Sequence, residues 1–268
     1  MQRRLSCGLP ICAAALLGQP VATGERVFLA CTTDGTVFDL NASTGTAQSP
    51  RATELSHVID IETDAAGRLF TLTSLAGTAP NSLYAVDATS GSATLIGATG
   101  LSAIYEGDLA FNASNGFLYG IQSVPQGSRR FFRIDPDTGL AIELAHLGFS
   151  GDFSGLTYAR DKLFAIDTVA DVLYELHPIT GTILSSLALS VAIDSSVCGM
   201  DYDAETDTMY VVARAVGVEG LFSLDWSSGQ MTLIGETGIA GLAGLCIVPE
   251  PGVCVMLAGM MTLALRRR

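Results

Sequence analysis

The chain has 268 residues, of which 15% are charged, and a formal net charge of −13 at pH 7. Residues 24–248 contain 9 basic and 26 acidic residues. This balance argues against nucleic acid as a partner, because phosphate binding needs clustered Lys and Arg side chains. Divalent cations or neutral glycans fit the charge better. The 29 glycines and 49% hydrophobic residues favour buried strands joined by tight turns.

Residues 1–23 predict a secretory signal peptide. Arg3 and Arg4 precede a short apolar run at 11–18, and the small residues of Pro20–Thr23 follow it. A charged start, a short apolar stretch and a small-residue exit are typical of such signals. The alternative is a buried first strand, against which Pro10 and Pro20 argue.

A repeated hairpin follows, and it is clearest at Leu83–Gly100. Leu83–Val86 is apolar on both alternating faces, which predicts a strand buried on both sides. Asp87–Gly91 then supplies an Asp side chain that can accept backbone N–H groups and a Gly for a positive φ. Ala93–Ile96 is the predicted return strand.

Four more segments have this pattern: Val37–Gln48, Phe131–Leu144, Leu173–Leu187 and Leu221–Gly235. The turn glycines of the five units recur every 42 to 48 residues: Gly45, Gly91, Gly139, Gly181 and Gly229. His177 stands where the other units have Asp or Asn, so we expect it to have a structural role in its turn. A repeat of this length, made only of strands and turns, indicates a β-propeller.

A second hairpin precedes each of the last four units, at Asp60–Leu72, Asp108–Ile121, Gly155–Asp167 and Gly199–Val212. Two hairpins make one four-stranded blade. The first unit begins at Arg26–Ala30 with one strand too few, and the missing strand is found at Gly244–Val248. Residues 24–248 are therefore predicted to form an all-β, five-bladed β-propeller of four-stranded antiparallel blades, closed by the C-terminal strand pairing into the first blade.

The last residues, 249–268, have a different character. The segment at the end of the last strand is Val248, Pro249, Glu250, Pro251 and Gly252, and the chain closes on Arg266, Arg267 and Arg268. Between them Val253–Leu265 carries no charge and predicts a short apolar tail helix. The run is shorter than the about 20 residues of a spanning helix, so one interpretation is a frayed terminal helix. The arginines directly after it favour a membrane tail with its basic end in the cytoplasm.

This tail resembles the PEP-CTERM sorting signal of Gram-negative bacteria. The resemblance implies export, transient anchoring in the inner membrane, processing near the Pro-Glu-Pro by an exosortase-type enzyme, and delivery to the cell surface or its polysaccharide matrix. The logic is that of other removable C-terminal anchors. The body resembles secreted propellers with LY-x-(I/V)D-x-x-(T/S)G units, a likeness of fold that implies no chemistry.

Residues 24–248 contain three cysteines, Cys31, Cys198 and Cys246. We expect buried strand thiols. The alternative is a disulfide between Cys31 and Cys246 in the closing blade, but the expected register puts Cys246 opposite about Phe28. No Cys/His spacing typical of a zinc site occurs.

The candidate site lies on the predicted inner strands, which carry Asp60, Glu62, Glu106, Asp108, Asp152 and Asp201. Carboxylates that converge on one axis repel each other unless they share a cation, and calcium accepts six to eight oxygen ligands. One hypothesis is therefore a calcium site built from Glu106, Asp108, Asp152 and Asp60. The alternative is that these acids end strands and face water.

Two further candidates lie near these strands. His57 is expected near the channel mouth, where a structural role is favoured over a functional one. The stretch Asp201–Asp207 has the alternating oxygens of a calcium loop, but it lacks the Gly and Glu that such loops need, and a hairpin turn explains it equally well.

No catalytic constellation is evident, so the favoured function is that of an exported, non-catalytic binding or structural propeller. The alternative is a secreted, calcium-dependent hydrolase or lactonase with its site at the channel mouth. No cofactor is predicted apart from the calcium that this alternative requires. The expected partners are an exosortase-type processing enzyme, the membrane before processing, and a polysaccharide matrix.

Overall fold

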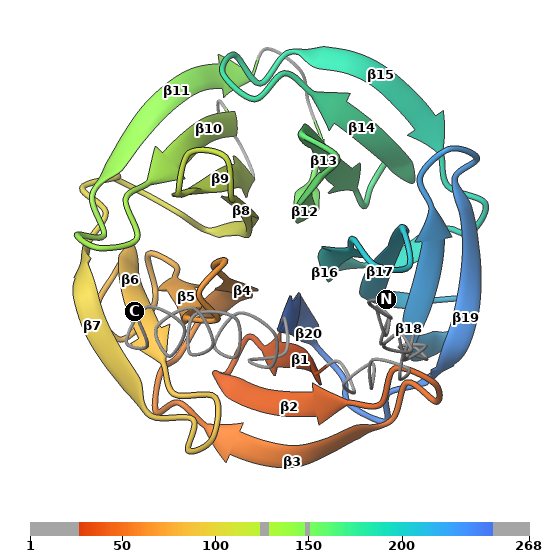
Figure 1. The fold of residues 1–268 in the computed structure, drawn as a ribbon, viewed down its shortest axis with the longest axis horizontal. Coiled ribbons are helices and arrows are strands. Elements are labelled where there is room, and N and C mark those ends of the chain that lie inside the picture. Colours follow the sequence, from red (N-terminus) through yellow and green to blue (C-terminus); the bar gives the residue numbers. More distant parts are fainter. Residues whose placement is uncertain (1–26, 124–128, 148–150, 249–268) are drawn as a thin grey trace, which may run out of the picture.

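A computed structural model describes residues 27–123, 129–147 and 151–248. In these residues the chain forms twenty strands and no helix, arranged as five four-stranded antiparallel sheets around a central axis (Figure 1). The predicted five-bladed β-propeller is confirmed. The predicted signal peptide, the predicted tail helix and the residues from Pro249 onward lie outside the described residues.

Within each blade the four strands follow one another from the central axis to the outer rim. From the innermost strand outward, blade 1 contains β20 (Leu242–Val248), β1 (Val27–Thr32), β2 (Thr36–Leu40) and β3 (Ala47–Ala52). Blade 2 contains β4 (Val58–Thr63), β5 (Leu69–Thr73), β6 (Ser82–Val86) and β7 (Ala93–Ala98). Blade 3 contains β8 (Glu106–Asn112), β9 (Phe117–Ser123), β10 (Arg129–Ile134) and β11 (Ala141–Leu147). Blade 4 contains β12 (Phe153–Ala159), β13 (Lys162–Asp167), β14 (Val172–Leu176) and β15 (Ile183–Ala188). Blade 5 contains β16 (Ile193–Asp203), β17 (Thr208–Ala215), β18 (Val218–Asp225) and β19 (Gln230–Glu236).

The turns between the third and fourth strands form as the repeated sequence predicts. In blade 2 the Asp87 carboxylate accepts the backbone N–H groups of Thr89 at 3.0 Å and Ser90 at 2.7 Å. In blade 4 the His177 Nδ1 atom accepts the N–H groups of the equivalent two residues at 3.2 and 3.3 Å. His177 therefore replaces an aspartate as a turn acceptor, which confirms its structural role.

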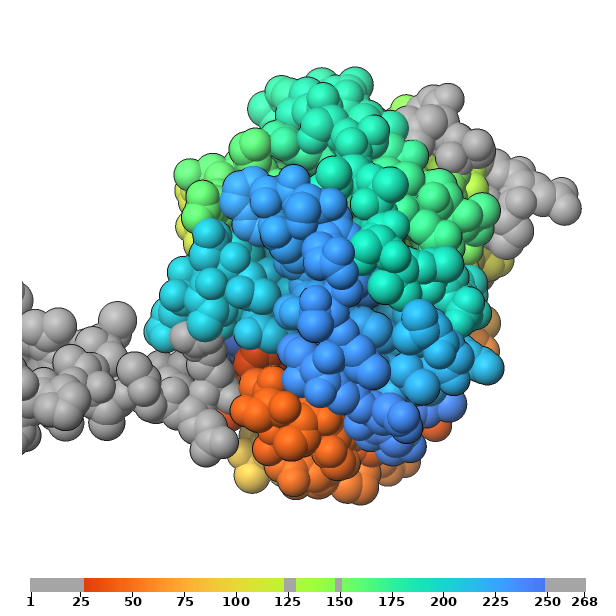
Figure 2. Space-filling model, turned by 90° about the vertical axis from the view of Figure 1, so that its right-hand side faces the viewer, coloured from red at the N-terminus to blue at the C-terminus, as the bar shows by residue number. Residues whose placement is uncertain are grey.

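The last strand of the described residues lies beside the first. β20 pairs antiparallel with β1, with Phe28 opposite Ile247 and Leu29 opposite Cys246. The register differs by one residue from the expected one, and a bulge between Cys31 and Thr32 interrupts the ladder. Figure 2 shows residues of blade 1 (orange) against those of blade 5 (blue) on the outside of the ring. Cys31, Cys198 and Cys246 are buried free thiols.

The hydrophobic core is divided among the five interfaces between neighbouring blades. One cluster of buried side chains fills each interface. At the junction of blades 5 and 1, for example, Phe28 and Phe38 pack with Val212 and Leu221. Both faces of the second and third strands are therefore covered, whereas the outer strands face solvent, as in the exposed Ile183–Ala188 strand of blade 4.

Each turn glycine also touches the outer strand of the preceding blade. The pairs are Gly45 with Gly235, Gly91 with Arg51, Gly139 with Gly97, Gly181 with Leu147, and Gly229 with Ala188. A Cβ on Gly139 would lie 2.8 Å from the carbonyl oxygen of Gly97. The glycine repeat that marks the fold in the sequence thus also sets the close approach of neighbouring blades.

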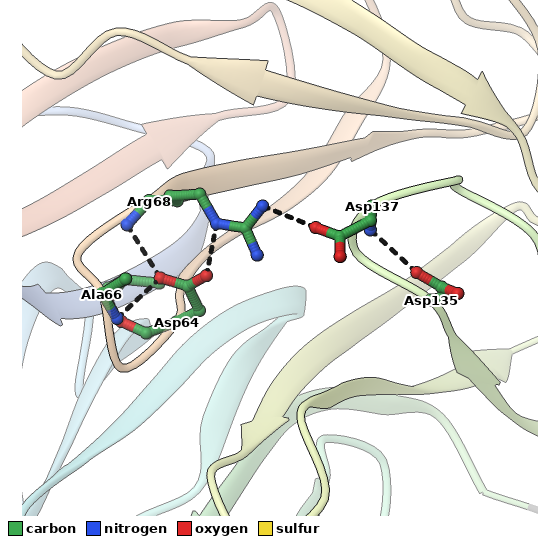
Figure 3. Close-up of polar contacts among 6 residues, drawn as sticks. Asp64, Ala66, Arg68, Asp135 and Asp137 are labelled. Atoms are coloured by element: carbon green, nitrogen blue, oxygen red, sulfur yellow. Dashed lines mark hydrogen bonds and ion pairs between the residues drawn. The ribbon is translucent and has the colours of Figure 1, made fainter.

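Ion pairs link neighbouring blades on one face of the ring. This is the face that carries the turn between the first and second strands of blades 2 to 5. Arg68 binds Asp64 of its own turn at 2.6 Å and Asp137 of blade 3 at 2.7 Å (Figure 3). Arg160 of blade 4 binds Asp207 of blade 5 through its Nε at 2.8 Å. The Arg68–Asp137 and Arg160–Asp207 pairs are exposed, so they orient the turns more than they stabilise the ring.

Candidate functional site

The innermost strands β4, β8, β12, β16 and β20 surround the axis of the ring (Figure 1). Asp60 of β4 and Asp108 of β8 occupy equivalent positions, and both are almost fully buried. The equivalent residues of the other three strands are Gly155, Gly199 and Gly244. The channel therefore carries two carboxyl groups at this level rather than five.

Both carboxylates accept a backbone N–H from the inner strand of the next blade. Leu109 N donates to Asp60 Oδ2 at 2.9 Å, and Leu156 N donates to Asp108 Oδ2 at 2.6 Å. The donors belong to strands that have no neighbouring strand on the channel side. A buried N–H without an acceptor costs about 1–3 kcal/mol, so each carboxylate stabilises the edge of the next blade.

Two residues further along the inner strands, Glu62 of β4 and Asp201 of β16 also accept a backbone N–H from the inner strand of the next blade. Phe111 N donates to Glu62 Oε2 at 3.1 Å, and Ile247 N donates to Asp201 Oδ2 at 2.7 Å. Thr157 also donates its hydroxyl to Asp201 Oδ1 at 3.2 Å. The hydrogen bond from Ile247 to Asp201 links blade 5 to β20, the strand that completes blade 1.

Burial raises the pKa of these carboxyl groups. The pKa of Asp60 is raised to about 8 and that of Asp201 to about 6, in both cases chiefly by loss of solvent. Burial and the neighbouring Asp60 charge raise the pKa of Asp108 well above its usual range. Asp60 Oδ1 has no hydrogen-bond partner among the described residues, which also favours a neutral carboxyl. Protonation, rather than a shared cation, can thus relieve the repulsion between these acids.

A cavity of about 240 Å³ lies at one mouth of the channel. Its apolar wall is formed by Val58, Ile59, Val197 and Ala243. Its polar residues include His57, Tyr105, Glu106 and Ser154. His57 therefore lies at the channel mouth, as expected, and its side chain is exposed. At the other end, Glu62, Asp201 and two tyrosines line a second cavity of about 180 Å³.

Glu106 differs from the acids inside the channel. Its half-buried carboxyl group makes no hydrogen bond or ion pair among the described residues. Burial and the nearby negative charge of Asp152 raise its pKa. Asp152 precedes β12, and its backbone carbonyl accepts Thr168 N at 2.9 Å.

The four acids of the calcium hypothesis are divided between two environments. Asp60 and Asp108 bind backbone N–H groups inside the channel, whereas Glu106 lies in the mouth cavity with Asp152 nearby. In the described part of the chain, no three His, Cys, Asp or Glu side chains are grouped so that they could hold a metal ion.

In the stretch Asp201–Asp207, the first three residues end β16, and residues 204–207 form the hairpin turn to β17. Asp203 Oδ1 accepts Glu205 N at 3.0 Å, and Asp203 Oδ2 accepts the Thr206 hydroxyl at 2.6 Å. Asp207 is paired with Arg160. The Asp203 oxygens hold the turn together, as the hairpin interpretation predicts.

Tyr105 lines the mouth cavity and was not singled out from the sequence. It lies just before the inner strand of blade 3, and its side chain is 45% exposed. An exposed aromatic residue next to an acid is the only sequence signal that could have identified it.

Solved structures with the same fold include one chain of a nidogen/laminin complex, with 14% sequence identity and a TM-score of 0.57, covering 84% of this chain and 99% of that chain. A protein of unknown function from Bacteroides caccae shares 11% identity with a TM-score of 0.55, covering 85% of this chain and 100% of the other. No family model and no curated protein matches the sequence. At these identities the likeness shows the fold alone. Within residues 27–123, 129–147 and 151–248 there is no helix long and apolar enough to span a bilayer.

Proposed function

We propose that this protein is an exported, non-catalytic β-propeller that acts as a binding or structural component of the bacterial cell surface. The observation that carries the proposal is the position of its sorting-type tail. The tail motif begins at Val248, which is the last residue of β20, so the motif follows directly on the ring. Cleavage after the Pro-Glu-Pro would leave all twenty strands in the released body.

The chemistry of the channel supports a binding role over a catalytic one. Asp60, Glu62, Asp108 and Asp201 accept backbone N–H groups from neighbouring blades, so these acids have structural work that explains their presence. The acidic body is suited to contact with neutral or cationic partners rather than phosphates. A polysaccharide matrix and an exosortase-type enzyme are the partners that the tail implies.

One observation favours the alternative of a calcium-dependent hydrolase or lactonase. The Glu106 carboxyl group lies in the mouth cavity, near the charge of Asp152, where a metal could reach it. Two carboxyl groups supply fewer oxygens than calcium takes, so water or substrate would have to complete the site.

The proposal is tested by following the full chain in a Gram-negative host that has an exosortase. The wild type should be shortened near residues 249–252 and reach the cell surface, as shown by mass spectrometry of its C-terminus and by surface labelling. Replacing Arg266, Arg267 and Arg268 with Glu should leave an unprocessed protein that does not reach the cell surface, because the tail no longer has a basic end to hold it across the inner membrane.

A charge reversal in the body serves as the control. Arg214 is exposed on β17, and Arg214→Glu should be processed and delivered like the wild type. The proposal is wrong if the triple variant is cleaved and displayed as efficiently as the wild type.

A further inference from the structure

The mouth cavity has the size of a site for a single ring. Its volume is about 240 Å³, and a cavity of about 150 Å³ is enough to bind benzene. It therefore has room for one substituted ring, but not for several linked sugar units. Its wall draws residues from all five inner-strand regions, so the site exists only in the assembled ring.

Part of the cavity wall is apolar and buried. Val58 and Ala243 are each 2% exposed, and Ile59 lies beside them on β4. An apolar wall contributes affinity by removing ring carbon from water. Its side chains offer no oxygen to a calcium ion, which takes six to eight oxygen ligands.

Among the polar residues of the cavity, Glu106 carries an acidic group that the fold leaves free to bind. The Ser154 hydroxyl already donates to the Ser196 carbonyl at 2.5 Å. The Glu106 carboxyl, by contrast, has no hydrogen-bond or ion-pair partner in the described part of the chain. A half-buried carboxylate without a partner is stabilised by a donor that carries positive charge.

The charges around Glu106 favour a ligand that carries positive charge. Asp152 adds negative charge close to Glu106, and among the described residues that line the cavity His57 is the only basic one. Anions are therefore disfavoured and cations attracted. Tyr105, exposed at the rim, presents an aromatic ring to which a cation can bind.

From this geometry we propose that the mouth cavity binds a small organic cation, a single ring that bears a protonated amine. The ammonium group binds the Glu106 carboxylate and the Tyr105 ring, and the ring carbons pack against Val58, Ile59 and Ala243. This inference does not depend on the tail or on export.

The test uses benzylammonium and its neutral counterpart, benzyl alcohol, titrated calorimetrically into the full chain at pH 8, where more of the Glu106 carboxyl is ionised. Benzylammonium should bind at least about tenfold more tightly than benzyl alcohol, the ratio expected for one charge-assisted hydrogen bond. Glu106→Gln keeps the shape and removes the charge, so it should raise the Kd of benzylammonium about tenfold and leave that of benzyl alcohol unchanged.

Two further variants make the result specific. Glu236→Gln makes the same change on the exposed outer strand β19 and should bind like the wild type. Tyr105→Leu should weaken benzylammonium more than benzyl alcohol, which provides a second reading if Glu106→Gln does not fold. Equal binding of the two probes, an unchanged Kd in both site variants, no binding of either probe, or displacement of benzylammonium by micromolar calcium would each overturn the proposal.

Discussion

At the scale of single residues, the turn glycines have two separate functions. Gly139 has a φ of 75°, a conformation that residues with a Cβ adopt at a cost of about 1–2 kcal/mol. Its Cα also faces the backbone of Gly97 in the preceding blade. Only the first function is evident from a single repeat unit, because the second depends on how blades are placed side by side.

The two functions can be separated by comparing two Gly→Ala variants. Gly116 has almost the same φ, 76°, but nothing lies within 4 Å of the position that its Cβ would occupy. Gly116→Ala should therefore lower the free energy of unfolding by about 1 kcal/mol, from backbone conformation alone. Gly139→Ala should lower the free energy of unfolding by about 1–2 kcal/mol more than Gly116→Ala does, because its Cβ would press on backbone atoms that cannot move independently.

Chemical denaturation of both variants measures the difference. If the two proteins lost the same stability, the contact between Gly139 and Gly97 would be easily relaxed, and the glycine repeat would reflect turn conformation only.

At the scale of elements, the inner strands depend on acids that belong to the previous blade. The unpaired edges of β8 and β12 receive their acceptors from Asp60 and Asp108, across a blade interface. These interactions hold the blades in register around the channel. They also place acidic groups where the charged form is poorly solvated, which couples the stability of the ring to pH.

The pH dependence has a definite sign. The folded pKa of Asp60, about 8, lies above that of an unfolded Asp, about 3.9, so the native state binds more protons between these values. This contribution to stability is complete below about pH 4 and is lost as pH rises through 8. We expect the free energy of unfolding to fall between pH 5 and pH 8.5, by roughly 2–4 kcal/mol for the Asp60 proton. Asp201, with a pKa of about 6, adds to the fall at the lower end.

Urea denaturation across this range checks the prediction, with Asp60→Asn as the main variant. The amide resembles the protonated acid, so the variant should have a flatter pH profile than the wild type. Asp225→Asn is the matched control, because the hydroxyl and N–H of Ser227 hold the pKa of the exposed Asp225 at about 2, outside the range tested. A wild-type stability that stayed constant or rose from pH 5 to 8.5 would contradict the assignment.

The sequence predicted the elements well because their signals are local. Leu83–Val86 is apolar at every position, and it became a buried strand. The Asp87 and His177 turns depend on residues two and three positions away. The environment of the acids could not be predicted in this way. Asp60 and Glu106 look alike in sequence, but one accepts a backbone N–H 49 residues away and the other lies in a cavity formed by five blades.

At the scale of the whole molecule, each blade is stable only against its neighbours. The five hydrophobic clusters all lie between blades, so no single blade has a core of its own. The two ends of the described chain meet inside blade 1, where β20 pairs with β1, and the junction of blades 5 and 1 lies beside this pair. There the N–H of Ala47 donates to the Thr237 carbonyl at 3.1 Å, and Asp201 accepts Ile247 N.

This arrangement predicts that β20 stabilises the whole ring and not blade 1 alone. Removing residues 241–268 should expose the edge of β1, leave Asp201 without its Ile247 donor, and uncover the apolar cluster around Phe28. Because the loss falls at a junction that every other interface depends on, thermal unfolding should begin at a lower temperature and spread over a wider range.

A chain ending at Val248, which keeps β20, is the control and should melt like the full protein. A synthetic peptide of residues 241–248 should raise the melting temperature of the shorter protein by mass action. If the shorter chain melted as cooperatively and at the same temperature as its control, the remaining four junctions would hold the ring unaided, and pairing of β20 with β1 would be a local feature of blade 1.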